Sequence, residues 1–289
     1  MQLDDFADGM NVIIGKNGSG KSSILDALRF SLSRIIPRIS EAGHGYIPSE
    51  KSDITVGKNA FRIKAKLRTE HVRFQNSLRY DDSWETDWSH DQDYLRDLIY
   101  EREGGVDSKP LAIYFSPRRF LTGKRDRSSD AYQGALAFRA LNLTGFAHWW
   151  NTREALSNRG YEPAQMQLNA LRKAVQSFLG DRYELIGPTR EGDSLLVCKR
   201  GVDIDVQNLS DGERGVLALV LDITKRLIQA NPEMEDPATN AEAIILIDEV
   251  ALHLHPGWQR SIVDNLTETF EECQFICTTH SPQVISELE

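Results

Sequence analysis

The sequence GKNGSGKS at residues 15–22 constrains the fold of this chain more than any other feature. It fits the pattern G-x-x-x-x-G-K-[ST], follows an apolar run at residues 12–14 and precedes apolar residues at helical spacing. These flanks predict a buried strand, a glycine-rich loop and a helix, whereas a plain glycine turn would require neither flank. The segment therefore predicts a phosphate-binding loop at the start of a helix in an α/β fold.

The residue types of this phosphate loop suit a bound triphosphate, because backbone N–H groups can wrap the phosphates at a helix N-terminus. Lys21 would place a positive charge on the outer phosphates, and the Ser22 hydroxyl would be a ligand of Mg²⁺. ATP and Mg²⁺ are the predicted cofactors. The predicted nucleotide-binding residues of the loop are Asn17, Gly18, Ser19, Gly20, Lys21, Ser22 and Ser23.

A second apolar run, at residues 244–247, ends in Asp248 and Glu249. Ligands of open α/β sheets bind beyond the carboxyl ends of the parallel strands, so both carboxylates are candidates for the site. Asp248 would bind Mg²⁺ directly or through water, and Glu249 would polarise the attacking water. By itself this pattern is equally typical of a strand that meets solvent, but beside the phosphate loop it predicts a hydrolytic site.

Residues 209–214, LSDGER, open a helical pattern that continues to residue 229. Ser210 is a predicted N-cap, Gly212 would permit close approach, and free helical N–H groups would favour an anion. Ser210 and Glu213 also stand at the S-x-x-E spacing of an ordinary capping box. Both interpretations are open from the residues alone.

Together these segments resemble the Walker A, signature and Walker B motifs of ATP-binding-cassette (ABC) ATPases. The chain is more closely similar to bacterial anti-phage ATPases of the overcoming-lysogenization-defect (OLD) and Septu groups, nearest the PtuA type, which also occurs with some retrons. IDEVALHLHPGWQR at residues 247–260 and FICTTHSPQVI at residues 275–285 carry this resemblance, and YFSPRR at residues 114–119 resembles their Tyr-Tyr-x-x-x-Arg strand. The match is strong over residues 11–30 and 207–286 and loose between them.

The resemblance implies a homodimer or higher oligomer in which two heads dock face to face. Each ATP would lie between the phosphate loop of one head and the signature residues Ser210, Gly212 and Glu213 of the other. His280 would contact the terminal phosphate and hold the attacking water with Glu249, although a histidine in this position is, by itself, more typical of a loop. The resemblance also implies a separate HNH-type nuclease subunit.

Three features of the sequence leave alternatives open within this resemblance. His253 and His255 fall in the loop that would line the dimer interface, and a zinc interpretation of this pair lacks further ligands. No residue clearly matches the glutamine that many cassette ATPases place near magnesium; Gln75 and Gln133 are distant candidates. Most relatives begin with an extra strand before the segment that matches residues 3–10, and many continue beyond the position of Glu289, so a shortened chain is one interpretation.

The predicted architecture is a single ATPase domain over residues 1–289, an α/β P-loop head of the ABC type. Alternating residues predict an antiparallel β subdomain at 51–80, with two or three strands. Residues 81–109 are polar and acidic and predict a surface insertion. Helical spacing across 131–180 predicts an inserted helical lobe, in which Trp149 and Trp150 favour core packing over a partner surface.

Composition limits the partners. The chain carries a net charge of −9, and Arg260 is the only basic residue after position 230. A uniformly basic nucleic-acid binder is therefore excluded, although a local patch remains compatible with nucleic acid, an acidic partner, nucleotide phosphates or simple solvation. The basic residues that cluster in the middle of the chain are Arg118, Arg119, Lys124, Arg125 and Arg127.

No segment approaches the roughly 18 apolar residues that a membrane span requires, and the acidic start does not resemble a secretory signal. We therefore expect a cytoplasmic protein without a membrane partner. The favoured function is an ATP-driven switch subunit of a defence complex that controls a nuclease. One alternative is a recombination or DNA-repair ATPase, which long coiled-coil arms and a C-x-x-C hook would favour, although the sequence shows neither. The others are a transporter subunit and the ATPase part of an OLD-like nuclease whose nuclease domain lies beyond residue 289.

Overall fold

The computed structural model describes residues 6–40, 47, 53–54, 58–68, 73–81, 108–109, 111–117, 130–138, 141, 143–181 and 183–288. The basic cluster at 118–127, the predicted strand residues 55–56 and residues 82–107 of the predicted insertion lie outside this part. The elements are β1 (Met10–Ile14), α1 (Lys21–Ile39), β2 (Ala60–Arg68), β3 (Arg73–Asp81), β4 (Leu111–Phe115), α3 (Leu143–Ser157), α4 (Glu162–Leu179), β5 (Tyr183–Pro188), β6 (Leu195–Lys199), β7 (Val202–Asp205), α5 (Asp211–Ala230), α6 (Pro237–Asn240), β8 (Ala243–Ile247), α7 (Pro256–Thr269), β9 (Cys273–Thr279) and α8 (Pro282–Ser286).

A four-stranded parallel sheet, in the order β1-β9-β8-β4, forms the centre of the fold. A parallel sheet that is covered on both faces requires nearly continuous apolar strands. All five residues of β4 are buried, and Ile245, Leu246 and Ile247 of β8 have no exposed surface. The apolar runs in the sequence therefore become strands of this sheet.

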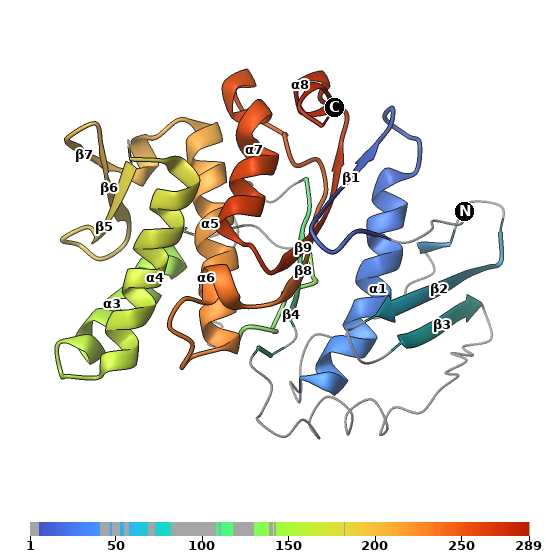
Figure 1. The fold of residues 1–289 in the computed structure, drawn as a ribbon, viewed down its shortest axis with the longest axis horizontal. Coiled ribbons are helices and arrows are strands. Elements are labelled where there is room, and N and C mark those ends of the chain that lie inside the picture. Colours follow the sequence, from blue (N-terminus) through green and yellow to red (C-terminus); the bar gives the residue numbers. More distant parts are fainter. Residues whose placement is uncertain are drawn as a thin grey trace.

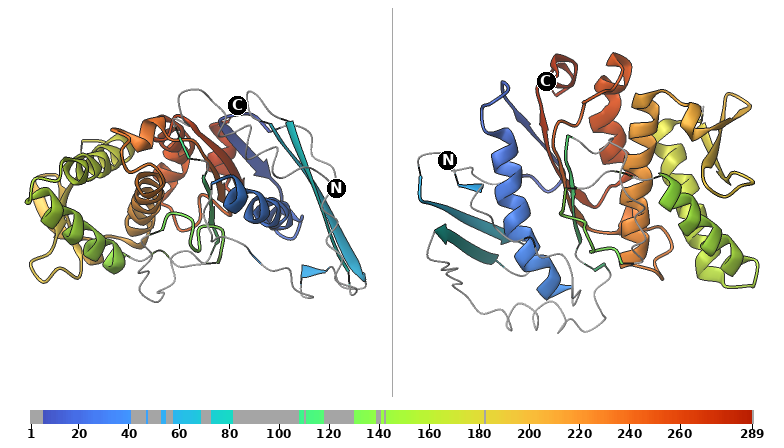
Figure 2. Two further views of the ribbon diagram at one scale, coloured as in Figure 1. Left: turned by 90° about the horizontal axis from the view of Figure 1, so that it is seen from below. Right: turned by 180° about the vertical axis from the view of Figure 1, so that it is seen from behind.

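Helices cover both faces of this sheet, with α1 on one side and α5 and α7 on the other (Figures 1 and 2). The β2–β3 hairpin lies on the outer side of α1, where the rings of Phe30 and Phe61 stack with their centroids 6.2 Å apart. The alternating pattern thus forms an antiparallel pair that packs on α1, outside the parallel sheet.

The helices α3 and α4 form a lobe beside α5, next to the antiparallel sheet β5-β6-β7 (Figure 1). Trp150 is fully buried and Trp149 is 9% exposed, which confirms their predicted role in the core. Residues 131–136 form turns, although their spacing predicts helix. Gly134 has φ of 65°, a conformation that an α-helix does not contain.

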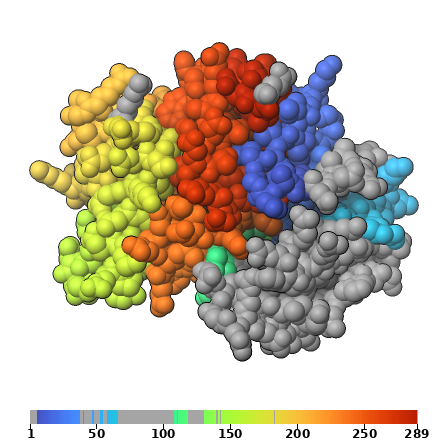
Figure 3. Space-filling model, in the orientation of Figure 1, coloured from blue at the N-terminus to red at the C-terminus, as the bar shows by residue number. Residues whose placement is uncertain are grey.

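The strand order places the predicted site residues at one edge of the sheet. Because β1, β8 and β9 are parallel, the segments that follow their carboxyl ends lie at the same edge, the upper end in Figure 1. In the same orientation, the space-filling view shows the residues of α7 and α8 at the surface, between the N-terminal segment and the lobe (Figure 3). No helix in the described part of the chain combines the length and hydrophobicity needed to cross a bilayer.

Candidate functional site

The phosphate loop has the backbone that its glycines predict. Gly18 and Gly20 have φ of 80° and 92°, which residues with a side chain rarely adopt, and Gly20 precedes the first turn of α1. A Cβ atom on Gly15 would lie 2.7 Å from Ser19 Oγ, so the loop leaves no room for a side chain there. Asn17, Gly18, Ser19, Ser22 and Ser23 are exposed around this loop, where they are accessible to a ligand.

Lys21 folds back over the loop instead of extending into solvent. Its ammonium group donates to the carbonyl oxygens of Gly15 at 2.8 Å and Lys16 at 3.3 Å, and the residue is only 6% exposed. The Nζ atom also lies 3.5 Å from Oε1 of Glu249, at the end of β8. The structure therefore brings together two predicted site residues that are more than two hundred positions apart in the sequence.

Glu249 links the ends of β8 and β9. Its Oε2 atom lies 2.7 Å from Nδ1 of His280, which follows β9, and its φ of 52° is unusual for a residue with a long side chain. His280 is exposed, while the Glu249 side chain is 16% exposed. The two predicted catalytic residues thus contact each other at the edge where the phosphate loop lies.

The hydroxyl of Thr278 in β9 forms hydrogen bonds with both residues that follow β8. It donates to Oδ1 of Asp248 at 2.5 Å and accepts the backbone N–H of Glu249 at 2.8 Å. Thr278 is fully buried and Asp248 is 2% exposed, so the hydroxyl satisfies a buried carboxylate and, beside it, a backbone N–H. The sequence analysis missed this residue, although a threonine near the end of a buried strand, two positions before His280, is a usable signal.

Ser22 and Asp248 fit the chemistry of a magnesium site, because hydroxyl and carboxylate oxygens are the donors that Mg²⁺ prefers. A further carboxylate, Asp26, lies one helical turn after Ser22. Burial raises the pKa of Asp26, Arg29 opposes that rise, and the nearby charge of Asp248 adds to it. The i+4 spacing places Asp26 on the same face of α1 as Ser22, and its carboxylate pairs with Arg29 at 3.2 Å.

The signature segment forms a complete capping box at the start of α5. Ser210 is the N-cap: its Oγ accepts the N–H of Glu213 at 3.4 Å, and the Glu213 carboxylate accepts the N–H of Ser210 at 3.1 Å. Lys199 and Tyr183 also donate to Glu213. Burial favours a raised pKa for Glu213, but the hydrogen bonds from Lys199, Tyr183 and Ser210 prevail and lower it to about 2.

Gly212 contacts the loop that follows Glu249. A Cβ atom at this position would lie 2.9 Å from the carbonyl oxygen of His253, a residue with φ of 64°. His255 caps α7, because its Nδ1 accepts the N–H of Gly257 at 3.3 Å, in agreement with a structural role. Among the described residues, no hydrogen bond or ion pair joins residues 209–214 to the phosphate loop of the same chain.

The glutamine candidates receive no support from this geometry. Gln75 lies in β3, in the hairpin outside the central sheet. Gln133 is exposed in a turn, and its backbone carbonyl accepts a hydrogen bond from Arg226. Neither observation assigns an amide side chain to the candidate magnesium site.

Comparison with known proteins decides the family. A family model described as "AAA domain, putative AbiEii toxin, Type IV TA system" matches residues 10–286. The chain belongs to this AAA-domain family. The match includes the phosphate loop, the α3–α4 lobe and the signature segment. It also includes β8 and β9, which are followed by Asp248 and Glu249 and by His280.

The curated relatives that match nearly all of this AAA-domain chain are retron ATPases and Septu proteins. The Retron Vc95 probable ATPase of Vibrio cholerae serotype O1 biovar El Tor is 28% identical, with 95% of this chain and 66% of the relative covered. The Retron Ec83 probable ATPase of Escherichia coli is 26% identical, with 97% and 66% covered. Septu protein PtuA of Bacillus mycoides is 28% identical, with 94% and 34% covered. The predicted resemblance to the Septu and retron group is confirmed, and the chain spans less than two thirds of these relatives.

Solved structures show the same fold at low identity. The Smc head bound to the C-terminal winged-helix domain of ScpA has a TM-score of 0.57 at 15% identity, with 98% of this chain and 85% of that chain covered. The SMC head domain from Thermotoga maritima has a TM-score of 0.52 at 17% identity, with 99% and 85% covered. The predicted fold class, an α/β ATPase head with additional antiparallel strands, is confirmed.

Proposed function

We propose that this chain binds ATP with Mg²⁺ and hydrolyses it as the switch subunit of an anti-phage defence complex. The phosphate loop would hold the triphosphate, with Lys21 facing the outer phosphates. Glu249 would take a proton from the attacking water, and His280 would position that carboxylate and the terminal phosphate. The observation that carries this proposal is the convergence of Lys21, Glu249 and His280 at one edge of the sheet.

The contacts of Lys21 suggest how the site accommodates a nucleotide. In the structure its charge is offset by two carbonyl oxygens and by Glu249. A phosphate oxygen near the loop would compete for the same ammonium group and so release the Glu249 carboxylate toward water. Ser22 and Asp248 would hold Mg²⁺, which when bound neutralises the charge on the phosphates. Binding of the nucleotide and activation of the base are thereby joined through one lysine.

We further propose that two copies of the chain share each nucleotide. Ser210 is exposed at the N-terminus of a 20-residue helix, an end that favours anions. The described residues of one chain do not connect this end to the phosphate loop of that same chain. Ser210, Gly212 and the capping carboxylate of Glu213 would therefore complete the site of a second head, as the resemblance to cassette ATPases implies.

A defence role and a nuclease partner rest on the named relatives. Retron and Septu ATPases are the curated matches over nearly all of this chain. The resemblance to Septu ATPases favours action through a second protein, and an HNH-type nuclease is the proposed partner. A cytoplasmic location agrees with the same relatives. A recombination-type ATPase shares the fold, so fold similarity does not separate the two functions.

Equilibrium titration of ATP into the Lys21→Ala variant tests the nucleotide-binding part. We expect nucleotide affinity to fall by about tenfold or more, because the only buried cation of the loop is removed, whereas Lys58→Ala at an exposed position should match the parent. Equal affinity of Lys21→Ala and the parent would overturn the assignment of the loop.

Expression with the neighbouring genes and phage challenge tests the cellular part. We expect protection against phage to require Lys21 and Glu249, and an adjacent nuclease to co-purify with the chain. Full protection by the Lys21→Ala variant would contradict a role for nucleotide binding in defence. Sensitivity to DNA damage on deletion, without any effect on phage, would favour the recombination-type alternative.

A further inference from the structure

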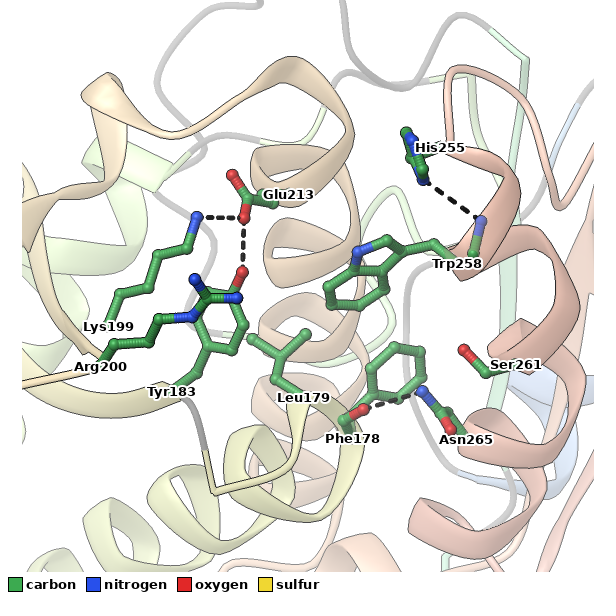
Figure 4. Close-up of a pocket in the computed structure, with 11 residues that line it drawn as sticks. Phe178, Leu179, Tyr183, Lys199, Arg200, Glu213, His255, Trp258, Ser261 and Asn265 are labelled. Atoms are coloured by element: carbon green, nitrogen blue, oxygen red, sulfur yellow. Dashed lines mark hydrogen bonds and ion pairs between the residues drawn. The ribbon is translucent and has the colours of Figure 1, made fainter.

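A pocket of about 420 Å³ lies between β5, β6, and the N-terminal turns of α5 and α7 (Figure 4). Its volume is within the range of about 300–1,000 Å³ that is typical of small-molecule sites. No residue of the phosphate loop lines it, and Asp248, Glu249 and His280 do not line it either. The pocket is therefore separate from the site of the proposed hydrolysis, although Glu213 of the signature segment forms part of its wall.

Two cations, Lys199 and Arg200, line one wall of the pocket, and they differ in whether a carboxylate balances their charge. Lys199 lies 2.5 Å from Oε1 of Glu213, so most of its charge is already balanced by that carboxylate. Arg200 is exposed, and among the described residues no carboxylate pairs with it. Arg200 lines the pocket together with Lys199 and Tyr183 (Figure 4). The pocket thus holds one cation in excess, which suits a single anionic group rather than a triphosphate.

The backbone at Arg200 points to a role for its side chain. Arg200 and Gly201 have φ of 54° and 80° and join β6 to β7, the pattern of a two-residue type I′ turn. Asparagine and glycine favour the first position of this turn, whereas an arginine there is uncommon. The turn itself does not require an arginine, and the side chain that this residue brings lines the pocket.

The opposite wall is aromatic. Trp258 extends into the pocket from α7, with its ring at 6.3 Å and 70° to the ring of Tyr183 (Figure 4). Trp258 is partly exposed, so a flat ligand can cover apolar surface that water now contacts. Nδ1 of His255 accepts the N–H of Gly257, which assigns the proton of the neutral ring to Nε2 and leaves a donor at the rim of the pocket.

We propose that this pocket binds a nucleoside monophosphate, with the base against Trp258 and the phosphate on Arg200. The planar guanidinium suits a bidentate contact with phosphate oxygens, and the indole ring suits any base because every base has a flat face. Lys199 and the donor of His255 would contribute further hydrogen bonds to the phosphate or the ribose. Since Lys199 also holds Glu213, an occupied pocket would act directly on the start of the signature helix.

Calorimetric titration of AMP into the Lys21→Ala chain tests this proposal without the phosphate loop. We expect AMP to bind this chain as it binds the parent, within about twofold, because the pocket is separate from Lys21. The Arg200→Asn substitution should weaken AMP by at least about tenfold while it keeps the turn, since asparagine tolerates positive φ. Arg190→Asn, at an exposed position outside the pocket, is the matched control and should leave AMP affinity unchanged.

Two further measurements distinguish the contribution of the base from that of the phosphate. Adenosine and inorganic phosphate should each bind at least about tenfold more weakly than AMP, and Trp258→Phe should weaken AMP less than Arg200→Asn does. Competition by a short 5′-phosphorylated oligonucleotide would assign the site to the end of a strand, and lack of competition would assign it to the free nucleotide. The proposal is overturned if Lys21→Ala abolishes AMP binding, if Arg200→Asn behaves as Arg190→Asn does, or if phosphate binds as tightly as AMP.

Discussion

Nδ1 of His280 lies 2.7 Å from Oε2 of Glu249, across the carboxyl ends of the adjacent strands β9 and β8. The contact is made by two residues that follow buried strands, so the sheet itself fixes their separation. The opposite oxygen of the same carboxylate lies 3.5 Å from Nζ of Lys21. The Glu249 side chain is thus held between a cation and an imidazole.

The Glu249→Gln variant tests whether this carboxylate is the base. We expect turnover of ATP to fall by about a hundredfold or more, because an amide cannot accept the proton of the attacking water. Nucleotide binding should persist, since Lys21 retains its carbonyl contacts. Single-turnover hydrolysis and equilibrium binding measure the two effects, with Glu268→Gln on the exposed face of α7 as the control. Undiminished hydrolysis in Glu249→Gln would place the base elsewhere.

The Thr278→Val variant tests the support of the carboxylate pair. Valine has nearly the same shape but leaves Asp248 and the N–H of Glu249 without the hydroxyl. We expect the free energy of unfolding to fall by about 1–3 kcal/mol and turnover by about tenfold or more. Urea denaturation and hydrolysis assays give both values, and Thr267→Val at an exposed position of α7 should change neither. Normal turnover in Thr278→Val would reduce this residue to a packing role.

Gly212→Ala and Gly257→Ala form a matched pair at the second position of two helices. The added Cβ atom would lie 2.9 Å from the backbone oxygen of His253 in the first case and 3.6 Å from a side-chain atom of His255 in the second. We expect Gly212→Ala to lower the free energy of unfolding by about 1–3 kcal/mol, and Gly257→Ala to leave it within about 0.5 kcal/mol. Equal stability of the two variants would contradict close packing of the signature segment on the His253 loop.

Glu213 predicts a defined dependence of stability on pH. Its pKa is lowered from an ordinary value of 4.5 to about 2, so the ionised carboxylate stabilises the folded state. That contribution is complete above about pH 4.5 and is lost as the pH falls from there toward about 2. Urea denaturation should therefore show Glu213→Gln as less stable than the parent at pH 7, with a smaller difference at pH 3. A difference that grows on acidification would contradict the assigned contacts, and Glu184→Gln on β5 is the exposed control.

The elements of the central sheet could be predicted from the sequence because each carries its own signal. The four apolar residues at 244–247 are all removed from water when the strand is covered on both faces, as in a parallel sheet of an α/β fold. The loop at residues 15–22 indicates a strand before it and a helix after it. Residues 131–136 misled the same reasoning, since helical spacing of apolar residues also occurs in a turn that is packed against the core. Gly134 with positive φ is the local signal against a helix.

Site residues that stand in a nucleotide-binding motif could be predicted from the sequence. Residues that only position those side chains could not. Lys21, Asp248 and Glu249 stand in patterns whose residue types a nucleotide would demand. Thr278 acts by holding Asp248 and the backbone of Glu249, and such a role depends on which strands are neighbours. Lys199 reaches Glu213 from a hairpin that is 14 positions earlier in the sequence, and no local pattern specifies that contact.

The pairing of β1 with β9 has a consequence for synthesis of the protein. The side chain of Asn11 donates to the carbonyl oxygen of Phe275, across 264 positions of sequence. While the ribosome is still translating the preceding segments, the strand that leads into the phosphate loop lacks this neighbour and cannot be held in register. Nascent chains should therefore acquire the competence to bind nucleotide only after β9, residues 273–279, has left the ribosome.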